Sequence, residues 1–198
     1  LLGRLSLFGE GGARLHDEVL AAAAECVAPE GRGTKSGLRP LGEGDKADVL
    51  KLIEEALAQP RLRESEAPLQ DRLRSGASRD VAELTPNLQR RADLLIDRAS
   101  RELGKRAEAE AADMAKILTE QRKRIEKRQQ QLDEESRQGR LAFNPDEERQ
   151  LADDQRYWQA RLSAIARELA DEPDRIRRSY HVRATRIEAV GVVYLWPL

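Results

Sequence analysis

The sequence predicts a mainly α-helical α+β protein, in which a long antiparallel helical (coiled-coil) hairpin is inserted in a small base with a short β-sheet formed by the N- and C-terminal strands. Three observations predict this fold class: the composition, a heptad spacing of apolar residues in the middle, and alternation of apolar and polar residues at both ends. Charged residues make up 36% of the 198 residues, and aromatic residues only 4%. This composition is typical of long solvated helices with a narrow apolar stripe.

The N-terminal part predicts a strand, a short helix and a loop. Leu5 and Leu7 alternate with polar residues in Leu1–Phe8, which is the period of a half-buried strand. Arg14–Val27 follows with a small, alanine-rich face and is interpreted as a helix. Residues 29–44 hold five glycines and two prolines and predict a surface loop.

Two more helices are expected before the centre of the chain. Asp45 is a plausible N-cap for a helix over Lys46–Ala58, whose apolar residues share one face, and Pro60 would end that helix. A second short helix is predicted over Ala67–Leu84.

The centre predicts two long helices that form a hairpin. Thr85-Pro86 is a good helix start, and a helix is expected from there to about Gln138. Pro145 would begin a second helix that reaches about Asp171. Apolar positions step by four and three residues in both segments, as in a coiled coil. The predicted seam positions are Ala107, Ala111, Met114, Leu118, Gln121, Ile125, Arg128 and Leu132, and then Leu151, Gln155, Trp158, Leu162, Ile165 and Leu169. Packing of both stripes on a larger body is the alternative.

The C-terminal part predicts a β-hairpin. Tyr180, Val182 and Ala184 alternate with polar residues, and the almost wholly apolar Gly191–Leu198 is typical of a strand covered on both faces. The predicted domains are residues 1–84 for the strand and short helices of the base, 85–172 for the hairpin arm with its tip near 139–145, and 173–198 for the C-terminal β-hairpin.

The sequence carries no recognisable catalytic or metal-binding motif. A phosphate-binding loop needs Gly-Lys-Ser/Thr in that order, and residues 33–36 (GTKS) scramble it. His16, His181 and Cys26 are widely separated and lack the spacing of metal ligands. No apolar run approaches the roughly 18 residues of a membrane span. We therefore expect no catalytic residue, metal or cofactor in this chain, no membrane partner and a cytoplasmic location.

Two basic clusters are candidate nucleic-acid-binding sites. The first has five cations against one acid in seven residues, and the second has five arginines in twelve residues. Cations at this density are favoured by phosphate backbones through counterion release. A solvated helix face balanced by nearby acids is the alternative, and it is the preferred interpretation of the first cluster. The candidate residues are Arg122, Lys123, Arg124, Lys127 and Arg128, and then Arg175, Arg177, Arg178, Arg183 and Arg186.

Several segments carry a family resemblance. Asp171–Pro197 and Asn144–Leu162 resemble the end of the Swi/Snf-like helicase subunit of the bacterial DISARM phage-defence system. Leu5–Val19 and Leu69–Leu95 resemble the region that follows the motor in those proteins, so the resemblance covers nearly the whole chain. Its most specific part is the closing YLWP, Tyr194–Pro197.

The resemblance implies an accessory C-terminal region of a DNA-dependent ATPase. The motor, with its ATP and Mg²⁺, would lie upstream in a longer protein, and none of its catalytic motifs maps onto this chain. The implied partners are duplex DNA held through its phosphates, the upstream helicase lobes and other defence subunits. The expected function is to brace the motor and to contact DNA or partner subunits. A purely structural coiled-coil module for oligomerisation or docking, without DNA contact, is the alternative.

Overall fold

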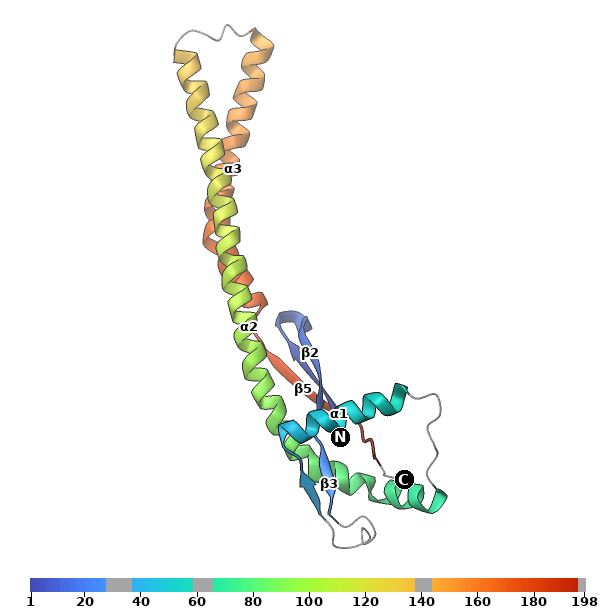
Figure 1. The fold of residues 1–198 in the computed structure, drawn as a ribbon. Coiled ribbons are helices and arrows are strands. Elements are labelled where there is room, and N and C mark those ends of the chain that lie inside the picture. Colours follow the sequence, from blue (N-terminus) through green and yellow to red (C-terminus); the bar gives the residue numbers. More distant parts are fainter. Residues whose placement is uncertain (28–36, 59–65, 138–143, 196–198) are drawn as a thin grey trace. The chain divides into compact units, whose positions relative to one another are not determined.

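The computed structural model describes residues 1–27, 37–58, 66–137 and 144–195. It confirms the predicted fold class: most described residues are helical, and the N- and C-terminal strands share a small antiparallel sheet (Figure 1). The chain divides into two compact units. We call Leu1–Ser100 with Val182–Leu198 the sheet unit, and Arg101–His181 the hairpin unit.

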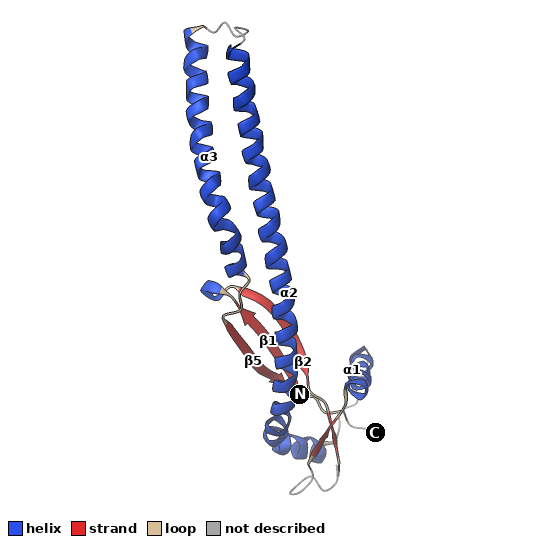
Figure 2. Cartoon of the chain, turned by 90° about the vertical axis from the view of Figure 1, so that its left-hand side faces the viewer, coloured by secondary structure: helices blue, strands red, loops and turns tan. Residues whose placement is uncertain are grey.

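The sheet unit is built around β1 (Leu2–Phe8). This strand pairs antiparallel with β2 (Arg14–Ala21) on one side and with β5 (Ala184–Gly191) on the other (Figure 2). A 3-10 turn with Gly11 and Gly12 at φ values of 65° and 78° reverses the chain between β1 and β2. Positive φ is strained for other residues, so the two glycines make this reversal possible.

The two faces of the sheet differ in polarity, as the alternation in β1 predicts. Leu5 and Leu7 are fully buried on one face. On the other face, Arg4 donates hydrogen bonds to Asp17 of β2, and the Ser6 hydroxyl donates to the same carboxylate at 2.9 Å. These hydrogen bonds hold the pKa of the Asp17 carboxyl well below its usual range, first through Arg4 and then through Ser6.

The helix predicted over Arg14–Val27 is wrong. Residues 14–21 form β2, and Ala24–Cys26 forms β3, which pairs antiparallel with β4 (Leu38–Pro40). Pairing with β1 decides this segment, because β2 supplies a second partner for this central strand. Part of the predicted loop 29–44 lies outside the described residues, and its end forms β4 and the start of α1 (Glu43–Ala58).

Helix α1 begins earlier than predicted, so Asp45 lies inside it instead of capping it. Pro60 lies outside the described residues. Aliphatic side chains of α1, the β3–β4 ribbon and residues 192–195 line a cavity of about 520 Å³ in the sheet unit. The buried Asp80 carboxylate lies at this cavity, and it accepts a hydrogen bond of 2.6 Å from the Tyr194 hydroxyl.

A single helix, α2 (Ala67–Arg137), replaces the two helices predicted over 67–84 and 86–138. Pro86 lies inside it and does not end it, so Thr85 is not an N-cap. The Thr85 hydroxyl instead donates to the Val81 carbonyl at 2.7 Å, one turn back. Buried Leu84 and Leu88 flank the proline, and their packing offsets the backbone hydrogen bond that proline cannot make.

Helix α3 (Pro145–Ser179) starts where the sequence predicts and ends later. The Asn144 side chain accepts from the backbone N–H groups of Asp146 and Glu147, and the Glu147 carboxylate accepts from the Asn144 N–H. This capping box and the proline at the start define a firm N-terminus. The helix continues through Pro173 past the predicted end at Asp171.

The predicted C-terminal β-hairpin is wrong within the described residues. Residues 180–183 and 192–195 form no strand, and β5 is a single strand that pairs with β1. The predicted domain boundaries at 85 and 173 fall inside α2 and α3, and the predicted hairpin tip at 139–143 lies outside the described residues.

Candidate nucleic-acid interface

In the hairpin unit, the packing of the two long helices decides which of their side chains face outward. Its part of α2 and helix α3 run side by side (Figures 1 and 2). The predicted seam is buried or half-buried at every position except Gln121 and Arg128, which are exposed. Gln129 takes the half-buried position expected for Arg128. The seam therefore stays intact along most of its length, and Arg128 belongs to the outer surface.

Polar contacts join the two helices across the seam. Arg161 of α3 donates to Gln121 of α2 at 2.8 Å and, within α3, to Glu168 at 2.7 Å. The hydrogen bond to Glu168 is the main reason that the pKa of Arg161 is raised. Tyr180 donates to Glu110 at 2.5 Å, and this bond raises the pKa of the phenol. These contacts fix the antiparallel register of α2 and α3.

The first basic cluster is exposed on α2, at 122–128. Arg122 lies 3.4 Å from the Glu126 carboxylate. The other four cations form no ion pair with any described residue, and we call them the basic band: Lys123, Arg124, Lys127 and Arg128.

The basic band occupies one side of α2. Successive residues of an α-helix rotate by about 100°, so the four side chains fall within an arc of about 140°. The half-buried Ile125 and Gln129 lie on the other side of the helix, toward the seam. The band therefore faces away from α3. Four neighbouring cations on one exposed arc can contact consecutive phosphates of a nucleic-acid backbone.

The second basic cluster is largely neutralised by carboxylates. Arg175 donates to Glu172 at 2.6 and 2.8 Å. Arg177 donates to Glu108 of α2 at 3.0 Å and to Asp174 at 2.8 Å, and these bonds raise its pKa.

The remaining arginines of this cluster are divided between the two units. Arg186 of β5 pairs with Glu188, whereas Arg178 and Arg183 have no ion pair among the described residues. Arg183 precedes β5, so the predicted placement of this residue on a strand is wrong. The cluster that the sequence favours thus has less uncompensated charge than the basic band.

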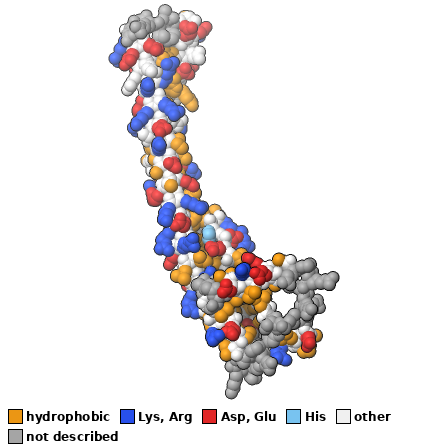
Figure 3. Space-filling view, viewed as in Figure 1, with side chains coloured by type: hydrophobic (Ala, Val, Ile, Leu, Met, Phe, Trp, Pro, Cys, Tyr) orange, Lys and Arg blue, Asp and Glu red, His pale blue; other side chains and the backbone are white. Residues whose placement is uncertain are grey.

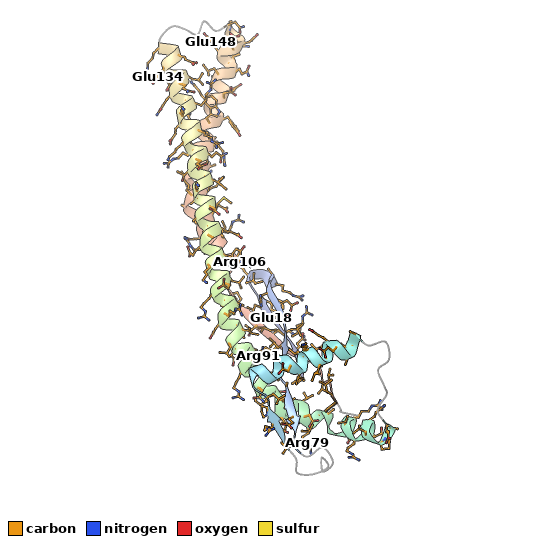
Figure 4. The ribbon with its side chains drawn as sticks, viewed as in Figure 1. Glu18, Arg79, Arg91, Arg106, Glu134 and Glu148 are labelled. Atoms are coloured by element: carbon orange, nitrogen blue, oxygen red, sulfur yellow. The ribbon has the colours of Figure 1, made fainter. Side chains whose placement is uncertain are left out.

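Acidic side chains gather at the end of the hairpin next to residues 138–143. Glu134 of α2 and Glu148 of α3 lie at the same end (Figure 4). Basic and acidic side chains are interspersed along the hairpin in Figure 3, and some basic side chains also lie beside the acids at this end. Sequence reasoning missed this acidic end, although acids on both sides of the predicted turn could have indicated it.

The described ranges offer no other candidate chemistry. Within them, no group of three or more His, Cys, Asp and Glu side chains could hold a metal ion. His16 lies 3.1 Å from Glu18 on the sheet, and Cys26 lines the apolar cavity. No helix in these ranges combines the length and the apolar character needed to cross a bilayer.

Fold and site together define a mainly helical α+β protein whose helical hairpin carries an exposed basic band. Comparisons with protein families, with curated proteins and with solved structures found no match.

Proposed function

We propose that this chain is an accessory C-terminal region of a Swi/Snf-like ATP-dependent DNA helicase or translocase in bacterial anti-phage defence, acting in the cytoplasm. It braces the motor, and its hairpin grips duplex DNA through the phosphates. ATP and Mg²⁺ belong to the upstream motor in this proposal, and other defence subunits are further partners. The basic band, with four cations that no described carboxylate neutralises, is the observation that supports DNA contact most directly.

The band predicts a specific salt dependence. Four phosphate contacts correspond to a slope of about −3.6 in a plot of log affinity against log salt concentration. Affinity should then fall about 150-fold between roughly 50 and 200 mM salt. Base stacking contributes little, because aromatic side chains make up only 4% of the sequence. Binding should therefore be nearly independent of DNA sequence.

The test measures binding of labelled duplex DNA to the wild type and to a variant with glutamine at the four band positions. A matched control carries the same four-charge change at cations that each pair with a carboxylate three residues earlier: Lys105, Arg149, Arg156 and Arg175. We expect the band variant to lose affinity and most of the salt slope, while the control keeps at least part of both. Equal losses in the two variants would mean that only net charge matters. Absence of wild-type binding at low salt would reject DNA contact.

The alternative is a purely structural coiled-coil module for oligomerisation or docking without DNA contact. It has less support in its interchain form, because α2 and α3 of one chain already bury or half-bury most of the seam residues. A partner would have to use exposed side chains such as Ile117 and Tyr157. Salt-insensitive self-association without DNA binding would favour this alternative.

A further inference from the structure

The small sheet has two edges, and they differ in how they resist pairing with another strand. An edge strand offers unpaired N–H and C=O groups to any strand that approaches it, and charged side chains are a common protection. The β2 edge carries a run of ionisable residues, Arg14 and His16–Glu18, with Asp17 bonded to Arg4. Such a strand is a poor partner for a second copy of itself.

The β5 edge carries fewer charged residues than the β2 edge, and a β-bulge at Val190 interrupts its pairing with β1 only near its end. Six of its eight residues are exposed, and Val190 exposes 67% of its surface. The strand has no lysine and no proline, and its two charged residues, Arg186 and Glu188, form an ion pair with each other. An edge of this kind is open to β-strand addition.

The sequence of β5 also complements itself. If two copies of β5 pair antiparallel about a two-fold axis at Ile187, Arg186 of each copy lies opposite Glu188 of the other. Thr185 then faces Ala189, at the ends of the regular stretch that precedes the bulge at Val190. Opposite charges directly across an antiparallel pair are stabilising, and like charges are destabilising. No like charges face each other in this register.

We propose that two copies of this chain associate through β5, antiparallel and centred on Ile187. The two three-stranded sheets then form one continuous six-stranded antiparallel sheet. The interface is isologous, as two-fold symmetry requires, because each copy contributes the same strand. It gains two cross-strand Arg–Glu pairs within the regular part of the strand, Ala184–Ala189. The helical seam takes no part in this association.

Charge reversal tests the register. In Arg186→Glu the interface would place glutamates opposite glutamates, and in Glu188→Arg it would place arginines opposite arginines. Each variant alone should therefore be monomeric at concentrations where the wild type has twice the mass of the chain. An equimolar mixture should form a heterodimer, because each strand then faces opposite charges. The ion pair within each strand remains broken in the mixture, so recovery can come only from pairing between chains.

Sedimentation equilibrium over a wide concentration range measures these masses. The double variant Arg186→Glu/Glu188→Arg is the positive control and should dimerise like the wild type. As a second measurement, Ile187→Cys in a Cys26→Ser background should give a disulfide-linked dimer. A wild type that stays monomeric at all concentrations overturns the proposal. Single variants that dimerise as well as the wild type, or a mixture that stays monomeric, also overturn it.

Discussion

Replacing Gly3 by alanine should destabilise the sheet unit, because β1 approaches α2 very closely at this position. A Cβ atom at Gly3 would lie 2.6 Å from a Leu88 methyl carbon and 3.2 Å from the Glu188 carbonyl oxygen. Leu88 is only 2% exposed, so its side chain has little room to move away. The Glu188 oxygen belongs to the backbone of β5 and is fixed by strand pairing.

Two opposing effects set the expected change in the free energy of unfolding. Overpacking of a buried site costs about 1–3 kcal/mol. The alanine also lowers the conformational entropy of the unfolded chain, which stabilises the folded state by about 0.4–1 kcal/mol. We therefore expect Gly3→Ala to lower the free energy of unfolding by about 1–2 kcal/mol. For a chain of this size, that corresponds to a fall in Tm of about 2–8 °C.

Thermal and urea unfolding, followed by circular dichroism, measure this change. Gly104→Ala is the matched control, because Gly104 lies inside α2 with no neighbouring atom within 4 Å of the added methyl group. This control should stabilise the protein, by up to about 1 kcal/mol. The cost of Gly3→Ala should shrink in a Leu88→Ala background, where the clashing methyl carbons are gone. If Gly3→Ala were as stabilising as the control, the close packing inferred between β1 and α2 would be wrong.

Two further predictions concern the seam and the polar face of the sheet that carries Arg4, Ser6 and Asp17. Ile165→Ala should lower the free energy of unfolding by about 2–5 kcal/mol, because Ile165 is fully buried. Ile117→Ala, at a position 59% exposed, is the same change outside the seam and should cost less than about 0.5 kcal/mol in urea unfolding. The lowered pKa of Asp17 means that its carboxylate stabilises the fold above about pH 4, and that this contribution is lost as the pH falls further. Stability measured from neutral pH to about pH 2 should therefore fall less steeply in Asp17→Asn, and identical profiles would contradict the bonds from Arg4 and Ser6.

The hairpin could be predicted because helical periodicity is a local property of the sequence, whereas β2 could not. In residues 14–27 the alanine run and the spacing of leucines suit a helix. The structure places Glu18 and Leu20 opposite Leu5 and Gly3 of the central strand, and this pairing outweighs the local preference. The helix start predicted at Thr85-Pro86 fails for a similar reason, because tertiary packing of Leu84 and Leu88 carries one continuous helix through the proline.

The ion pair between Arg177 and Glu108 in the candidate interface could not be predicted either, because it joins residues that are distant in sequence. The sequence reveals both basic clusters, but not which cations find a carboxylate. Glu108 neutralises Arg177 across the hairpin, from a position 69 residues earlier in the chain. Only the register of α2 against α3 brings this pair together. The four cations of the basic band gain no such partner among the described residues, so the band keeps more uncompensated charge than the cluster that the sequence favours.

The placement of β1 has a consequence for the order of folding. β1 pairs with β2, its neighbour in sequence, and with β5, near the other end of the chain. The first pairing closes a short loop, while the second must enclose nearly the whole polypeptide and so costs more chain entropy. The contacts between α2 and α3 join segments that are closer in sequence than β1 and β5 are. Pairing of these two helices reverses the direction of the chain, and β5 can join β1 only after this reversal. The hairpin should therefore form early, and attachment of β5 should limit the rate at which the sheet is completed.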